Sequence, residues 1–166
     1  MTEKTASIAA ATRALVVERT YRARLDELWA LWTTKDGFES WWGPDGFRVE
    51  VHRLESRDGG AIDYTMIADT PEMVAAMKQM GRPSAHETHA TFTRFQPQTR
   101  LALTHRIDFV PGVPPYDSTM AVEFLPSGDH VRMVVTLDPL HDEQMTRMSV
   151  MGFTSQLSKL DKRFGV

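Results

Sequence analysis

The sequence predicts an α+β fold in which a curved antiparallel sheet of about seven strands wraps around a long C-terminal helix. Alternating apolar and polar residues recur in short runs that turn residues separate, as in antiparallel strands. Two short helical patterns follow the first run, and one long helical pattern covers Asp142 to Phe164. Only this last helix is long enough to cover the concave face of the sheet, so we expect the two to pack together.

The first strand is predicted over residues 14–23, where β-forming residues alternate loosely. A helix follows, because four apolar residues recur at the spacing of one helical face. It cannot pass far beyond Gly37, and a second short helix is predicted from Phe38 to Trp42, ended by Gly43-Pro44. The four apolar positions of the first helix are Leu25, Leu28, Trp29 and Trp32.

A hairpin comes next, with Asp58-Gly59-Gly60 as its turn. Its two strands alternate, so each has one inward face. The inward residues are Phe47, Val49 and Val51 on the first strand and Ile62, Tyr64 and Met66 on the second.

A short helix is predicted between Thr70 and Gly81, since Thr70 suits the N-cap, Pro71 the first turn and Gly81 the C-terminal stop. One face carries Met73, Val74, Met77 and Met80. This helix could be a lid over the open end of the sheet, a dimer contact or a packed insertion. Four more strands are predicted at residues 86–95, 101–109, 119–125 and 131–137. The inner stripe of the long helix is predicted to hold Met145, Met148, Ser149, Gly152, Phe153, Gln156, Leu157 and Leu160.

Length and composition predict one domain, residues 14–166, after a flexible tail of residues 1–13. A net charge of -3 offers no basic face for nucleic acid, and the absence of cysteine excludes disulfides and thiolate catalysis. No apolar run approaches the ~20 residues of a membrane span, and the N-terminus does not read as a signal peptide. We therefore expect a cytoplasmic protein that binds neither nucleic acid nor membrane.

Several motifs together resemble one known family. They are Arg19-Thr20-Tyr21, Asp26-Glu27-Leu28-Trp29, Trp41-Trp42-Gly43-Pro44 with Phe47, Ser56-Arg57-Asp58-Gly59-Gly60 with Tyr64, and Gly152-Phe153 with Leu157 and Leu160. From about Leu15 to Phe164 the chain resembles the START-like, helix-grip superfamily known as SRPBCC, and within it the bacterial relatives of the C-terminal domain of the heat-shock-protein-90 ATPase activator. It departs from the family at Ala23-Arg24, where Ala-Pro is usual, and at Phe153, where Trp is usual. The resemblance implies the helix-grip fold but no catalytic residue, because the family shares none.

Polar side chains on inward faces are the candidates for a small-molecule site. His105 shares its strand face with Leu103, and His86 shares one with Phe92. An inward histidine could act as a general acid or base, although His105 and Arg19 could also simply satisfy one another or backbone groups in the core. The methionines could adapt to varied ligands or fill core gaps. The full set of predicted cavity-lining residues is Trp41, Val49, Tyr64, Met66, Met73, Met77, His86, Phe92, Leu103, His105, Met120, Met133, Met148, Phe153 and Arg19.

No metal site or cofactor is predicted. His86 and His89 would point to opposite faces of one strand, which does not suit a shared metal ion. Nucleophilic catalysis has no support either, because the chain lacks both cysteine and a Gly-x-Ser-x-Gly motif.

Three functions remain open. The first is binding of a hydrophobic or amphipathic small molecule, lipid-like or polyketide-like, between the sheet and the last helix. The second, implied by the resemblance, is a cyclase, dehydratase or hydrolase that uses the same cavity. The third is a module that contacts a chaperone, and a homodimer is a further expectation.

Overall fold

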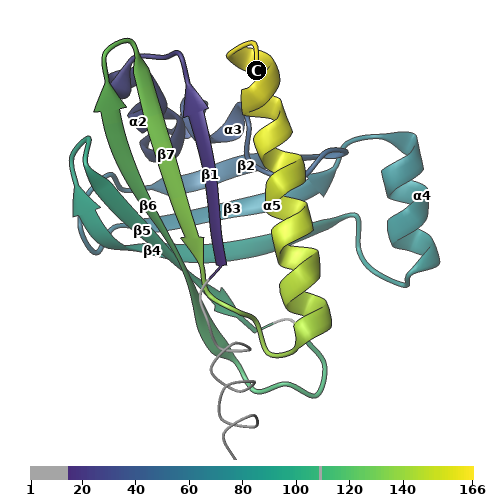
Figure 1. The fold of residues 1–166 in the computed structure, drawn as a ribbon. Helices are drawn as coiled ribbons and strands as arrows, with labels where there is room; N and C mark the ends of the chain where they lie inside the picture. Colours follow the sequence, from purple (N-terminus) through teal and green to yellow (C-terminus); the bar gives the residue numbers. More distant parts are fainter. Residues whose placement is uncertain (1–14, 109) are drawn as a thin grey trace, which may run out of the picture.

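The computed structural model describes residues 15–108 and 110–166, and it confirms the predicted fold class. A seven-stranded antiparallel sheet, in the order β1-β7-β6-β5-β4-β3-β2, curves beside the long helix α5 (Figure 1). The predicted tail and Phe109 lie outside the described residues. The strands are β1 Leu15–Tyr21, β2 Phe47–Leu54, β3 Ala61–Ala68, β4 Ala85–Gln96, β5 Arg100–Ile107, β6 Tyr116–Ser127 and β7 His130–Leu137. The helices are α2 Leu25–Thr33, α3 Lys35–Glu39, α4 Pro71–Gln79 and α5 Glu143–Arg163.

Two boundaries differ from the prediction in ways that affect the site. Helix α3 begins at Lys35 instead of Phe38, because the Thr34 side chain accepts a hydrogen bond from the Gly37 N–H group and caps the helix there. Trp41 and Trp42 therefore follow this helix. Strand β6 begins at Tyr116, three residues before the predicted start, directly after a proline pair.

The register of the sheet decides which inward side chains are neighbours. His105 on β5 lies opposite Ala90 on β4 and Ser118 on β6. Tyr64 on β3 lies opposite Thr88 on β4. Every pairing in the sheet is antiparallel, so side chains that alternate along one strand line up with those of its neighbours across the concave face.

An aromatic cluster fills one end of the concave face. Trp32 makes edge-on contacts with Trp41 and Trp42, with ring centroids 5.0 and 5.5 Å apart, and Phe38 stacks on Trp42 at 4.4 Å. All four rings are buried. Such pairs add about 0.5–1.5 kcal/mol each beyond the area that they bury. These contacts join α2, α3 and the loop after them, and Phe38 connects the cluster to the sheet through the ring of Tyr64 on β3, with centroids 5.4 Å apart.

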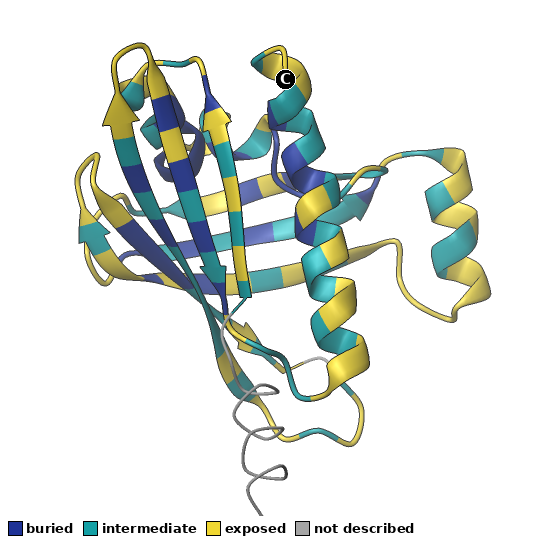
Figure 2. Cartoon of the chain, viewed as in Figure 1, coloured by how far each residue is buried: buried dark blue, intermediate teal, exposed yellow. Residues whose placement is uncertain are grey.

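Helix α5 is anchored along its C-terminal half. Its buried residues all lie there: Phe153, Gln156, Leu157 and Leu160. Lys159 Nζ donates hydrogen bonds to the carbonyl oxygens of Gly43 at 2.8 Å and Phe47 at 3.0 Å. No residue of the first half of the helix, before Phe153, is buried (Figure 2).

Helix α4 lies beyond the end of β3, apart from the body of the sheet (Figure 1). None of its residues is buried. The Met73 side chain reaches back to Gly46. Its methyl group lies 3.0 Å from the position that a Cβ on Gly46 would occupy. Thr70 caps the helix by accepting the N–H of Met73, as the sequence predicts.

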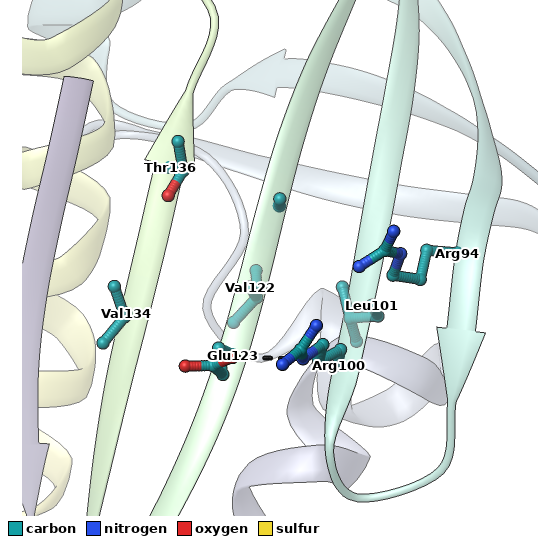
Figure 3. A pocket seen from close by; sticks show the side chains of 8 residues that line it. Arg94, Arg100, Leu101, Val122, Glu123, Val134 and Thr136 are labelled. Atoms are coloured by element: carbon teal, nitrogen blue, oxygen red, sulfur yellow. Dashed lines mark ion pairs between the residues drawn. The ribbon is translucent and has the colours of Figure 1, made fainter. Parts of the chain in front are cut away.

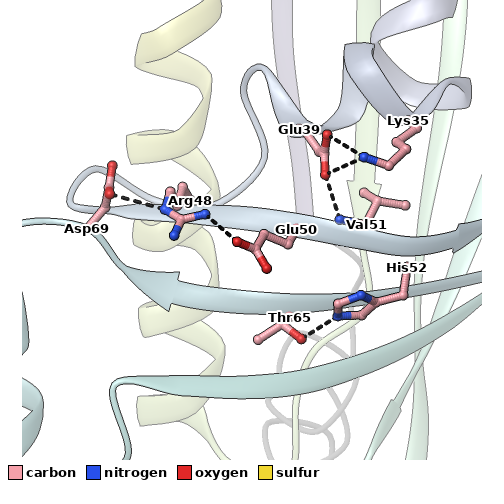
Figure 4. Close-up of polar contacts among 8 residues, drawn as sticks. All are labelled: Lys35, Glu39, Arg48, Glu50, Val51, His52, Thr65 and Asp69. Carbon is pink, nitrogen blue, oxygen red and sulfur yellow. Dashed lines mark hydrogen bonds and ion pairs between the residues drawn. The ribbon is translucent and has the colours of Figure 1, made fainter.

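Helix α3 is tied to the edge strand β2 by Glu39 (Figure 4). The register of β2 and β3 shifts between Val51 and Arg53, and Glu39 Oε2 accepts the N–H of Val51 at 2.8 Å beside this irregularity. Desolvation alone would raise the pKa of Glu39, but the hydrogen bonds from Val51 and Lys35 lower it below its usual value. The carboxylate thus stays charged and holds the helix in place.

Candidate functional site

The candidate site is a set of inward-facing residues that the core does not cover, here called the concave patch. It crosses four neighbouring strands, β3 to β6, and each member is only partly buried. Its eight members are Met66, His86, Thr88, His105, Ile107, Tyr116, Ser118 and Met120.

The patch contrasts with the rest of the concave face. Inward residues next to it, such as Ile62, Leu103 and Val122, are at most 2% exposed. The patch itself combines three apolar side chains with five that carry an uncharged polar group, and it contains no carboxylate, lysine or arginine. Small-molecule sites combine apolar surface with convergent polar groups.

The polar centre of the patch is the contact between Tyr64 and His105. The Tyr64 hydroxyl lies 3.0 Å from His105 Nε2 and accepts a hydrogen bond from Trp42 Nε1 at 3.1 Å. The rings of Trp42 and His105 are nearly parallel, with an interplanar angle of 12° and centroids 6.4 Å apart. The aromatic cluster therefore supports the polar group directly.

Burial sets the charge of this pair. Desolvation lowers the pKa of His105 to about 4, so the imidazole is neutral at pH 7. Desolvation also raises the pKa of Tyr64, so the phenol keeps its proton. The polar centre of the patch carries no net charge at neutral pH.

A second tyrosine–histidine pair lies at the other side of the patch. The Tyr116 hydroxyl is 2.7 Å from His141 Nδ1 and accepts the backbone N–H of His141 at 3.2 Å. His141 directly precedes Asp142, the N-cap of α5, whose side chain accepts the Met145 N–H. The start of α5 is thereby joined to β6, so both ends of the helix are attached to the sheet.

The structure places four of the predicted residues in the patch: Met66, His86, His105 and Met120. Tyr64 is 3% exposed and lies directly behind His105. Six others belong to the packed core, where each is at most 5% exposed: Trp41, Val49, Phe92, Leu103, Met133 and Phe153. Met73 and Met77 lie on α4, apart from the patch.

The last two predicted residues, Met148 and Arg19, lie away from the patch. Met148 was expected on the inner stripe of α5, but it is 52% exposed, because the buried stripe follows Phe153, Leu157 and Leu160 and leaves Met148 on the opposite side. Arg19 was predicted to line the cavity, with pairing to His105 or to backbone groups as the alternative, and its guanidinium lies 3.5 Å from Asp161 on α5. The same carboxylate accepts the Tyr21 hydroxyl at 2.7 Å.

Four members of the patch were not among the predicted site residues: Thr88, Ile107, Tyr116 and Ser118. Alternation along each strand places Thr88 with His86 and Ile107 with His105, so the signal for these two is in the sequence. Tyr116 and Ser118 precede the predicted start of their strand, so the predicted alternation of inward and outward side chains does not include them.

The sequence also predicts that His86 and His89 point to opposite faces of β4, and the structure agrees. His86 is partly buried on the concave face, where burial and then the charge of Arg82 lower its pKa. His89 is exposed and lies 2.7 Å from Asp63 on the other face. Within the described ranges, no group of three or more His, Cys, Asp or Glu side chains is placed to hold a metal ion.

Open depressions also occur on the convex face. One, of about 190 Å³, is lined by residues of β4 to β7 and crossed by the ion pair of Arg100 and Glu123 (Figure 3). Another, of about 500 Å³, has Arg53, His89 and the ion pair of Arg106 and Asp117 at its lining. Exposed ion pairs of this kind are worth little and rearrange easily.

A curved antiparallel sheet that holds a long C-terminal helix is the helix-grip arrangement of the START-like, SRPBCC proteins. A family model described as Activator of Hsp90 ATPase homolog 1-like protein matches residues 22–165, and the chain belongs to this family. No curated protein matches the chain. None of the helices in the described ranges is long and apolar enough to cross a membrane.

Solved structures of similar fold come from several bacteria. Protein CV1439 of Chromobacterium violaceum is 16% identical, with a TM-score of 0.71 over 92% of this chain and 97% of that one. The AHSA1 protein of Silicibacter pomeroyi is 20% identical, with a TM-score of 0.71 over 92% and 98%. The AHSA1-like protein of Aeromonas hydrophila is 15% identical, with a TM-score of 0.62 over 91% and 94%. At these identities the similarity concerns the fold.

Proposed function

We propose that this protein binds a small hydrophobic or amphipathic molecule on the concave patch. One observation carries the proposal: a contiguous, partly exposed surface of mixed apolar and polar side chains lies on the inner face of an otherwise packed sheet. Burying apolar surface is favourable by about 25 cal/mol for each Å² removed from water. A ligand that covers the apolar side chains of the patch would therefore be stabilised there.

An enzymatic use of the same site has less support. A histidine acts best as a general base when its pKa is near the working pH. Desolvation lowers the pKa of His105 to about 4, so it is a weak base at pH 7. Tyr64, with its raised pKa, is a weak acid there. Both groups suit recognition better than proton transfer.

The proposal can be tested with Nile red, an uncharged dye whose fluorescence rises in apolar surroundings. We expect the protein to bind the dye, and Ser118→Leu, which adds bulk inside the patch, to weaken binding at least about fivefold. Asp117→Leu is the matched control, because Asp117 is the neighbouring residue on the exposed face. Absence of binding, or equal binding by both variants, would contradict the proposal.

Native mass spectrometry of protein purified gently from its own host complements this test. A small molecule that remains bound in the wild type and is missing from Ser118→Leu would identify the natural ligand. The Asp117→Leu protein should retain it.

A further inference from the structure

The chemistry of the ligand can be inferred from the hydrogen bonds around His105. We propose that the concave patch selects uncharged ligands that carry a hydrogen-bond acceptor, such as a ketone, ester or amide carbonyl, and that the Nδ1–H group of His105 donates to it. This inference rests on the proposed function and names the ligand class for the same site.

The Tyr64 hydroxyl has three polar neighbours, Trp42, Thr88 and His105. Its oxygen accepts from Trp42 Nε1, which can only donate, and Thr88 also interacts with it from the opposite position on β4. The one proton of the phenol is then available for His105 Nε2 at 3.0 Å. An imidazole nitrogen is a stronger base than a hydroxyl oxygen, so it is the better acceptor for this proton. Tyr64 has no capacity left for a ligand.

The contact with Tyr64 decides the tautomer of His105. The ring is neutral, because burial lowers its pKa well below 7. A neutral ring carries one N–H, and since Nε2 accepts the proton of Tyr64, the hydrogen is on Nδ1. The hydrogen bonds from Trp42 to Tyr64 and from Tyr64 to His105 thus leave one donor, the Nδ1–H group of His105, for a ligand.

Nδ1 of His105 is available to a ligand. None of residues 15–108 and 110–166 forms a hydrogen bond with it. Among the described residues, the fully buried polar side-chain atoms without a partner are Trp32 Nε1 and Gln156 Nε2. Nδ1 of His105 also lacks a partner in this part of the chain but is not one of these buried atoms, so it is not fully enclosed. Ser118, the residue opposite His105 on β6, is also partly exposed. An acceptor placed on the patch would satisfy this donor.

Charge determines the rest of the preference. The patch offers two imidazoles, His86 and His105, whose pKa values burial lowers, and no lysine or arginine, so a bound carboxylate would lose its hydration without gaining a cation. A bound ammonium would find neither a carboxylate nor a free acceptor at Nδ1. Arg82, whose charge acts on His86 at the margin of the patch, is exposed.

The inference can be tested with three probes of similar length: 2-nonanone, octanoate and nonylammonium. We expect 2-nonanone to compete with Nile red at least about tenfold more strongly than either ion at pH 7, the effect of one net hydrogen bond plus the cost of burying a charge. His105→Phe should remove most of this advantage. His89→Phe makes the same change on the convex face and should preserve it.

A measurement on the unmodified chain covers the case in which His105→Phe does not fold. The ¹⁵N shifts of the His105 ring should report a neutral Nδ1–H tautomer, and addition of 2-nonanone should shift Nδ1 more than Nε2. Tyr64→Phe, which removes the proton donor to Nε2, should mix the two tautomers and weaken the binding of 2-nonanone. In this respect Tyr64 is a positioning residue.

The outcomes separate the two proposals. If Nile red binds but the three probes compete equally, or octanoate competes best, this inference is wrong and the proposed function stands. An Nε2–H tautomer in the wild type would also overturn it. If Nile red and all probes fail to bind, both proposals are wrong.

Discussion

The side chain of Gln156 accepts the backbone N–H of Gly43 at 2.9 Å, so the last helix of the chain holds the loop that follows the tryptophan pair. Both groups are buried. Lys159, one turn further along α5, binds the carbonyl oxygens of Gly43 and Phe47 from the same side of the helix. These three hydrogen bonds fix the position of Trp42, and through it the position of Tyr64.

Lys159→Met should lower the free energy of unfolding by about 2 kcal/mol, because it leaves two carbonyl groups without their charged donor. Lys162→Met, an exposed change in the same helix, should cost less than about 0.5 kcal/mol. Urea denaturation of the two variants measures the difference. Equal stabilities would mean that the Lys159 contacts contribute nothing.

Stability should fall between pH 6.5 and pH 4 because of His105. Its pKa is about 6.5 in the unfolded chain and about 4 in the folded one, so the unfolded chain takes up the proton first. The contribution is complete above pH 6.5 and is lost as the pH falls toward 4. It is at most about 3 kcal/mol, and less to the extent that the ring is exposed.

His105→Gln isolates this contribution. Other groups titrate in the same range, including His86, whose pKa is also lowered. The difference between the pH profiles of wild type and His105→Gln, from urea denaturation at each pH, removes their effect. Parallel profiles would contradict the assignment of a depressed pKa to His105.

Gly152→Ala should raise the free energy of unfolding by up to about 1 kcal/mol, because glycine is unfavourable inside a helix. A Cβ at this position would meet no atom within 4 Å. Gly60→Ala is the contrasting change, since a Cβ there would lie 2.0 Å from the Glu55 carbonyl oxygen. We expect it to cost at least about 2 kcal/mol in the same thermal or urea denaturation.

Trp41→Phe should cost about 2 kcal/mol more than Trp32→Phe, although both side chains are buried. Trp41 Nε1 donates to the Leu31 carbonyl at 2.8 Å, whereas Trp32 Nε1 is buried without a partner in the described residues. The same substitution therefore removes a hydrogen bond in one case and an unsatisfied donor in the other. Comparable losses would show that Trp32 has a partner in solution, such as a water molecule.

The sequence predicted the fold well because the fold depends on local patterns. Alternation, turn residues and the helical stripe each extend over fewer than about twenty residues and can be read without knowledge of the partner. The inward position of His105 follows from the same alternation, and the structure confirms it. The start of β6 was predicted too late because prolines precede Tyr116.

The contacts between elements could not be predicted in this way. The pairing of Arg19 with Asp161 depends on where α5 crosses β1, which no local pattern states. The contact of Tyr64 with His105 likewise depends on the strand between them. Met148 was misplaced because the predicted stripe was wider than the surface that the sheet covers.

The position of β1 has a consequence for how the chain folds. Strand β1 is the first to be synthesised, yet its partner is β7, with Leu15 opposite Leu137. Its backbone cannot be paired until nearly the whole chain is available, and such long-range pairing slows folding. A nascent chain that ends before β7 therefore leaves an unpaired strand, with Val16 and Val17 side by side, as a place where it can aggregate.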